Sequence, residues 1–253
     1  MTKLIALSDG HGIDTAGKRT PTLPNGQKSE TGKNYMNENL FNRAVVKYLD
    51  AELKRHGFKT ILVAPTDADT SLQARTDLAN SKKVDLYVSV HANANTGKFG
   101  NWGGIETFTW KSGESLRIGK LIHSELIKGS PLQDRGVKDG SHLWEIRKPQ
   151  APSVLVECGF MDSHNDYKYL LSDAYRKECA VEIAKGICKA YGVTYKAEVK
   201  VAPKKPSKTP SKASDDVFYR VVVGSFDNRE NAQEMQDKLK SKGFDSFLLP
   251  YEK

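Results

Sequence analysis

Short apolar runs alternate with longer segments of helical periodicity over the first 190 or so residues. Apolar runs bounded by turn residues favour buried strands, and apolar residues recurring every three to four positions favour amphipathic helices. Strands are expected at 3–8, 59–64, 85–90 and 153–156, and helices at 39–55, around 71–82, around 115–128 and at 174–191. This alternation predicts an α/β fold in which a mostly parallel central sheet is flanked by helices.

The pattern changes after residue 192. Residues 194–216 contain three prolines and six lysines and almost no large apolar side chain, which is typical of an extended spacer. Beyond it, a strand at 218–226, a helix at 228–242 and a strand at 244–250 are expected. The chain is therefore divided into a first domain at 1–192, a linker at 193–216 and a small strand-helix-strand unit at 217–253.

Polar side chains follow three of the predicted strands at the points where these strands end. His11 comes after the strand at 3–8, His91 directly after the strand at 85–90, and Glu157 directly after the strand at 153–156. Ligands of open α/β sheets bind outside the carboxyl ends of the strands. The three side chains are therefore expected to converge on one crevice.

Two histidines and one carboxylate match the donor set of a catalytic zinc site, which has three protein ligands and one open position. The chain has no HExxH helix, so these ligands come from separate elements. The carboxylate is either Glu157 or Glu38, which opens the helix at 39–55; in the second case Glu157 is free to act as a base. The alternative is that His11 and His91 are hydrogen-bonded loop histidines and Glu157 is a salt-bridged strand end.

Four short segments resemble the motifs of the zinc-dependent N-acetylmuramoyl-L-alanine amidases of the amidase-3 group, which cleave bacterial peptidoglycan. They are LSDGHG (7–12), ENLFN (38–42), SVHANAN (89–95) and VLVECGF (154–160), and the resemblance extends over about residues 3–191. It implies one Zn²⁺ ion held by His11, Glu38 and His91, with Glu157 as the catalytic carboxylate. The expected reaction is hydrolysis of the amide bond between N-acetylmuramic acid and L-alanine.

The chain departs from this family pattern in its first motif, where Ser8 and Asp9 stand in place of the common Asp-Pro or Asn-Pro. Glu30 is a neighbouring acid that rivals Glu38 as a ligand, and Glu38 is favoured because Asn42 follows it at the family's spacing. Asn93, two residues past His91, is expected to donate a hydrogen bond to substrate, although loop asparagines usually bond to nearby backbone.

Two other arrangements of polar residues are disfavoured alternatives. His142 and Glu145 are three residues apart and would form a second metal-binding pair. Cys158 adjoins Glu157, but no base that would activate it as a nucleophile is evident.

The tail resembles a peptidoglycan-binding SPOR repeat through residues 219–226, residues 231–244 and the closing FDSFLLP at 244–250. The resemblance covers about half of a normal repeat, and a unit of this size is below that which usually folds alone. Glycan binding is expected of the tail, and pairing with the tail of another chain is a hypothesis for self-association.

Composition restricts the setting. No apolar run approaches the roughly 18 to 20 residues that span a bilayer, so no membrane partner is expected. The N-terminus lacks the apolar segment of a signal peptide, and three cysteines are too few for a disulfide framework. The protein is expected to be made in the cytoplasm and to act on the wall after release, as a phage endolysin or a mother-cell autolysin.

The net charge of +8 suits nucleic acid, an anionic membrane face or an anionic cell wall. It is distributed as +5 over 1–192, +3 over 193–216 and zero over 217–253. The neutral tail, together with the lack of a phosphate loop or an aromatic RNA-binding signature, argues against nucleic acid. The leading alternative to an enzyme is a non-catalytic peptidoglycan-binding protein with a vestigial metal site.

Overall fold

The computed structural model describes residues 2–197, 228–244, 246 and 248. The chain divides into two compact units, Met1–Glu198 and Val199–Lys253. The domain boundaries expected at 192 and 216 stay a prediction. No helix in the described ranges combines the length and the apolar character needed to cross a membrane.

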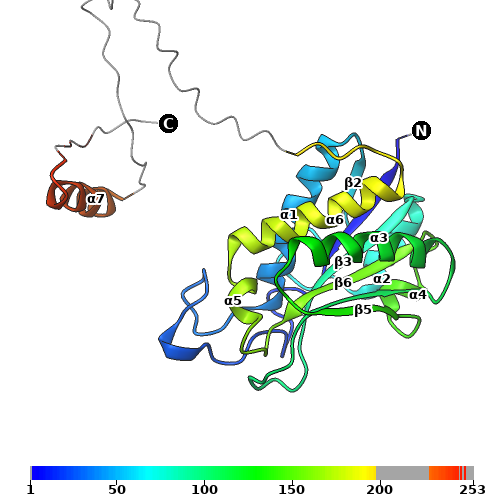
Figure 1. Cartoon of the computed structure of the whole chain (residues 1–253), viewed down its shortest axis with the longest axis horizontal. Coiled ribbons are helices and arrows are strands. Elements are labelled where there is room, and N and C mark those ends of the chain that lie inside the picture. The colour runs from blue at the N-terminus through cyan, green and yellow to red at the C-terminus, as the bar shows by residue number, and fades with distance from the viewer. Residues whose placement is uncertain (1, 198–227, 245, 247, 249–253) are drawn as a thin grey trace, which may run out of the picture. The chain divides into compact units, whose positions relative to one another are not determined.

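A six-stranded sheet forms the centre of the first unit, with the strands in the order β2-β1-β3-β6-β4-β5 (Figure 1). Strands β2, β1, β3 and β6 are mutually parallel, whereas β4 runs antiparallel to β6 and parallel to β5. The predicted α/β fold with a mostly parallel sheet is confirmed. The strands are β1 (Leu4–Asp9), β2 (Lys59–Leu62), β3 (Leu86–Asn93), β4 (Ile105–Thr109), β5 (Asp134–Asp139) and β6 (Ser153–Phe160).

All four long helices predicted for this unit are present, with their ends shifted by at most two residues. Three shorter helical segments, η1, α4 and α5, were not predicted. The helical segments are η1 (Pro24–Gly26), α1 (Glu38–Arg55), α2 (Leu72–Ser81), α3 (Gly113–Gly129), α4 (Trp144–Arg147), α5 (Tyr167–Leu170) and α6 (Asp173–Ala190).

The helices cover the sheet from both sides. Helices α1, α3 and α6 lie on one face, with α6 packed against both α1 and α3, and α2 and α4 lie on the other (Figure 1). Successive side chains of β3 alternate between these two layers, as strand geometry requires. Leu86, Val88 and Val90 belong to the larger core under α1 and α6, while Tyr87 belongs to the smaller core against α2.

Residues 193–197 pack back onto the last turn of α1. The ring of Tyr195 stacks on that of His56 with centroids 4.4 Å apart, and its hydroxyl donates a hydrogen bond to Glu52 Oε2 at 2.9 Å. The backbone N–H of Lys196 donates to His56 Nε2 at 2.9 Å. The chain therefore leaves the first unit beside the carboxyl end of α1.

In the second unit, the helix expected at 228–242 is confirmed as α7 (Arg229–Ser241), and the side chain of Asn228 caps it by accepting the N–H of Glu230 at 2.7 Å. The strand expected at 218–226 lies outside the described residues, as do four of the seven residues of the one expected at 244–250.

Candidate metal centre

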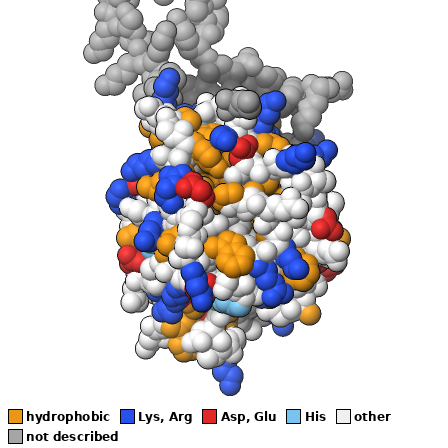
Figure 2. Space-filling model, turned by 90° about the vertical axis from the view of Figure 1, so that its right-hand side faces the viewer, with side chains coloured by type: hydrophobic (Ala, Val, Ile, Leu, Met, Phe, Trp, Pro, Cys, Tyr) orange, Lys and Arg blue, Asp and Glu red, His pale blue; other side chains and the backbone are white. Residues whose placement is uncertain are grey.

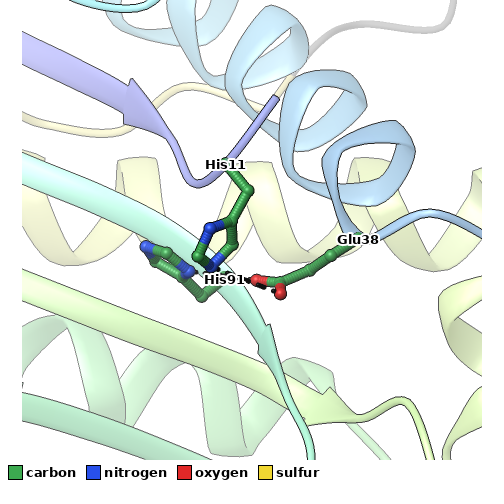
Figure 3. A group of neighbouring side chains, drawn as sticks. All are labelled: His11, Glu38 and His91. Atoms are coloured by element: carbon green, nitrogen blue, oxygen red, sulfur yellow. Dashed lines mark hydrogen bonds and ion pairs between the residues drawn. The ribbon is translucent and has the colours of Figure 1, made fainter. Parts of the chain in front are cut away.

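Three side chains from three different elements meet at the carboxyl end of the parallel strands. His11 follows β1, Glu38 is the first residue of α1, and His91 lies near the end of β3 (Figure 3). One donor atom of each lies within 4.8 Å of the others. Glu38 Oε1 is 3.0 Å from His91 Nδ1, and Glu38 Oε2 is 3.5 Å from His11 Nε2. The convergence expected for His11 and His91 is present, and Glu38 joins them.

The loop that carries His11 is held by the first turn of α1. Asn39 donates its side-chain amide to the carbonyl of His11 at 2.8 Å, and Asn42 donates to the carbonyl of Gly10 at 2.9 Å. His11 has a φ of 61°, a left-handed conformation that is strained for a residue with a Cβ atom. The hydrogen bonds from these two amides help to hold the backbone of the loop in this conformation.

Glu38 is only 2% exposed, and its carboxylate is held from two sides. Its Oε1 accepts hydrogen bonds from Asn42 Nδ2 at 3.1 Å and from the N–H of Ala92 at 3.2 Å. The rival acid Glu30 instead pairs with Arg176 at 2.6 Å and belongs to no cluster of potential metal ligands in the described ranges. The structure thus brings Glu38, rather than Glu30, to the two histidines.

The electrostatics of the cluster suit a cation. Burial lowers the pKa of His11 to about 4, so this histidine is neutral at pH 7. Burial also disfavours the charged form of His91, but the hydrogen bonds that its ring donates to the carboxylates of Glu145 and Glu38 outweigh this effect and raise the pKa of His91 to about 10. Burial likewise opposes the charge on Glu38, yet the two histidines hold its pKa below the ordinary value. A positive charge between these groups is therefore stabilised.

Glu157 lies beside this cluster, in register with His91 on the neighbouring strand β6. Its Oε2 atom is shielded from solvent, and no group in the described part of the chain donates a hydrogen bond to it. Burial, reinforced by the charges of Glu38 and Glu106, raises the pKa of Glu157 to about 8 despite the opposing effect of His91. A buried oxygen without a partner next to a metal-type cluster is available to exchange a proton with a bound molecule.

The prediction that His91 and Glu157 follow their strands is wrong by a few residues. The strand expected to end at residue 90 continues to Asn93, and the one expected to end at 156 continues to Phe160. The reason is that β3 and β6 pair with each other through the His91–Glu157 position, so the polar residues stay in the ladder. The side chains consequently have fixed spacing across two hydrogen-bonded strands.

The remaining sequence candidates have local contacts. Asn93 donates its side-chain amide to Glu106 at 3.1 Å and accepts the N–H of Ala94 at 2.8 Å, so its contact with substrate stays a prediction. His142 is exposed and its ring lies against Phe108, whereas Glu145 is buried, so they form no metal pair. Cys158 is buried in the large core, and contact with Cys179 together with burial raises its pKa well above the ordinary value.

Sequence reasoning did not place Glu145 beside His91. Its Oε2 lies 3.4 Å from His91 Nε2, on the side of the imidazole away from Glu38. Polar residues recur at alternate positions 87, 89 and 91 of an otherwise apolar strand. Buried polar groups need partners, so this stripe was a usable signal, although it does not reveal which residue supplies the partner.

Gly10 leaves no room for a larger residue behind the cluster. A Cβ atom at this position would lie 2.1 Å from Cε1 of His91, so Gly10→Ala must displace the imidazole. We expect the affinity of this cluster for a divalent metal ion to be about 10- to 100-fold lower in Gly10→Ala, as when the support of a ligand is lost. Titration against a chromophoric chelator measures this.

Gly113→Ala is the control for general loss of stability, because Gly113 has a φ of 75°, which is strained for alanine, and no atom within 4 Å of the added methyl group. It carries the conformational cost of about 1 to 2 kcal/mol but should leave the metal affinity unchanged. Equal affinities for the wild type and Gly10→Ala would contradict the placement of His91.

Comparison with known proteins gives a consistent picture. A family model described as N-acetylmuramoyl-L-alanine amidase matches residues 5–189, and a SPOR domain model matches residues 194–250. The second match begins within the segment expected to be a linker.

Similar proteins include the N-acetylmuramoyl-L-alanine amidase CwlM of Bacillus licheniformis, which is 27% identical over 75% of this chain; the chain spans about two thirds of its length, at 66%. The endolysin of Bacillus phage SPP1 is 30% identical over 83% of this chain and 74% of its own length. Among solved structures, the catalytic domain of the CwlV amidase from Bacillus (Paenibacillus) polymyxa var. colistinus matches with a TM-score of 0.65 and 25% identity, over 76% of this chain and all of that one.

Proposed function

We propose that this chain is a zinc-dependent peptidoglycan amidase. It belongs to the N-acetylmuramoyl-L-alanine amidase family, because the family model matches well over half of the chain. The scissile bond is the lactyl amide between N-acetylmuramic acid and the L-alanine of the stem peptide. The observation that carries the proposal is the cluster of His11, Glu38 and His91 beside the buried Oε2 atom of Glu157, which has no hydrogen-bond partner among the described residues.

The donor set fits zinc. Two imidazole nitrogens and one carboxylate oxygen are the ligands of a common class of catalytic zinc site. Bond lengths of about 2.0 to 2.2 Å around a tetrahedral ion place neighbouring donors about 3.3 Å apart. The two Glu38–histidine distances, 3.0 and 3.5 Å, bracket that value. His11, Glu38 and His91 would hold one ion and leave its fourth position open.

A bound zinc ion would polarise the amide carbonyl and make water acidic enough to ionise near neutral pH. The chain's own part in the reaction falls to Glu157. We assign its Oε2 as the atom that takes a proton from the attacking water and passes it to the departing nitrogen of L-alanine. The shielded position of Oε2 keeps it free of competing hydrogen bonds until substrate and water arrive.

The wall itself is the proposed partner. We propose that the SPOR-like tail binds the uncharged glycan, since residues 217–253 carry no net charge, and that the basic first unit is attracted to wall anions. On the face drawn in Figure 2, Lys and Arg side chains are spread widely over the surface. Surface charge of this kind raises association rates with polyanions and is screened by salt.

For the biological setting we propose an enzyme that is released to the wall for lysis, as an endolysin is. The similarity to the SPP1 endolysin supports this, because it covers 83% of this chain, compared with 75% for the CwlM amidase.

We expect the purified protein to contain one zinc ion per chain and to release L-alanine N-termini from isolated walls. Metal analysis and mass spectrometry of the digested peptidoglycan measure these two quantities, and a chelator should stop release until zinc is restored. Wall binding without any cut bond would support the non-catalytic alternative, and a cut at a glycosidic or peptide bond would contradict the assigned reaction.

A further inference from the structure

We propose that Glu145 is a positioning residue for the metal ligand His91, which it holds with its Nε2–H pointing inward and its Nδ1 atom facing the metal. This inference rests on the proposed zinc site. Glu145 is 3% exposed and lies on α4, a four-residue helix on the side of the sheet opposite to α1. It touches neither substrate nor metal, and it acts only through the imidazole.

The carboxylate of Glu145 accepts hydrogen bonds from side chains of two neighbouring strands, β1 and β3. Its Oε1 accepts hydrogen bonds from Ser8 Oγ of β1 and from the hydroxyl of Tyr87 of β3, both at 2.6 Å. Its Oε2 accepts one from Ser89 Oγ at 3.1 Å and lies 3.4 Å from His91 Nε2. Tyr87, Ser89 and His91 are alternate residues of β3, so all three project from the same side of the strand.

This arrangement determines which imidazole nitrogen carries the proton. A carboxylate only accepts hydrogen bonds, so the hydroxyl of Ser89 must donate its hydrogen to Glu145. The oxygen of Ser89 is then an acceptor for His91 Nε2, which lies 3.1 Å away. Both groups behind the ring therefore require Nε2 to keep its proton. Nδ1, which lies 3.0 Å from Glu38 Oε1, is the nitrogen that would lose its proton and offer its lone pair to a bound metal ion.

The buried charge of Glu145 is compensated from a second direction. Arg75 is 1% exposed, and its Nη1 donates to Ser8 Oγ at 3.0 Å and to the carbonyl of Asp9 at 2.8 Å. The hydroxyl of Ser8 links Arg75 to Glu145, because it accepts a hydrogen bond from the first and donates one to the second. A continuous chain thus runs from Arg75 through Ser8, Glu145 and Ser89 to His91.

Such a carboxylate behind a metal-bound histidine orients the ring and strengthens it as a ligand. The site has an independent reason to need this support. His11 and Glu38 are held by the first turn of α1, whereas Glu38 is the only described residue that forms a hydrogen bond with the His91 ring at Nδ1. Its orientation is therefore set from behind, by Ser89 and Glu145.

The test compares zinc-loaded wild type with Glu145→Gln, which keeps the shape of the side chain but removes its charge. We expect the dissociation constant for zinc, measured by competition with a chromophoric chelator, to rise by about 10- to 100-fold. Glu125→Gln is the control, because Glu125 is similarly buried but pairs with Lys128 and Lys189 on α3 and α6. It should bind zinc as the wild type does.

A second readout separates positioning from general stability. Proton–nitrogen NMR of the zinc-loaded wild type should show His91 with its proton on Nε2, and this signal should shift or exchange faster in Glu145→Gln. If that variant fails to fold, Ser89→Ala tests the same chain of contacts, with an expected rise of about tenfold in the dissociation constant.

The outcomes distinguish this inference from the function on which it rests. A wild type that binds no zinc and cuts no wall would overturn the proposed function. A wild type that binds zinc and cuts the amide, with unchanged zinc affinity and an unchanged His91 signal in Glu145→Gln or Ser89→Ala, would overturn the role of Glu145 alone.

Discussion

Replacing Glu157 by glutamine is expected to lower kcat by about 10²- to 10⁴-fold, the usual contribution of a general acid–base group. Glutamine has nearly the same shape but cannot accept a proton at Oε2 and return it to the leaving nitrogen. Because Glu157 is not a member of the cluster formed by His11, Glu38 and His91, the variant should still bind one zinc ion. The comparison therefore separates proton transfer from metal binding.

The measurement is the rate at which L-alanine N-termini appear on purified walls, with zinc content determined on the same samples. Glu125→Gln serves again as the control, since it removes a buried carboxylate that lies among lysines on the helices. Turnover of Glu157→Gln equal to that of wild type would remove Glu157 from the chemistry. Loss of zinc in this variant would instead make Glu157 a ligand, the alternative that the sequence alone left open.

Glu38→Gln should remove most of the zinc affinity. Glu38 supplies the only carboxylate of the cluster, and its two oxygens approach both histidines. The loss should exceed the roughly 10- to 100-fold effect that is typical of changing a group behind a ligand, because a ligand itself is altered. The negative charge that balances the ion is lost together with the donor atom.

The matched variant is Glu30→Gln, which changes the same residue type eight positions earlier in the chain. Glu30 is 41% exposed in its side chain but pairs with Arg176, which is buried, so this variant should lose some stability although Glu30 lies outside the cluster. Zinc affinity and wall hydrolysis should be unchanged in Glu30→Gln. If this variant loses zinc and Glu38→Gln keeps it, the assignment of the ligands is reversed.

Much of the site could be predicted because its residues stand next to strong periodic signals. His11, His91 and Glu157 adjoin apolar runs, and Glu38 begins an amphipathic helix, so parallel-strand geometry brings them together. The strand ends could not be predicted, since pairing between His91 and Glu157 extends the ladder through polar residues. The sequence around His91 does not indicate that it pairs with a strand some 65 residues further along the chain.

Strands β4 and β5 were missed for a related reason. The segment Asp134–Asp139 (DRGVKD) is charged and belongs to the strand at the end of the sheet, where burial on both faces is not required. Ile105–Thr109 has three polar residues out of five, and Glu106 is tolerated there because Arg135 and Lys138 neutralise it from β5. Its strand character thus depends on a neighbour that carries no apolar signal.

Helix α1 has the candidate metal centre at its first residue and the contacts of residues 193–197 at its other end. Glu38 is its first residue, and the contacts of Tyr195 with Glu52 and His56 lie at its other end. Eighteen residues at a rise of about 1.5 Å each make this distance about 27 Å. A fluorophore introduced at Lys196 would therefore lie near the end of α1 opposite to Glu38, and it could report on the stability of this helix without touching the cluster.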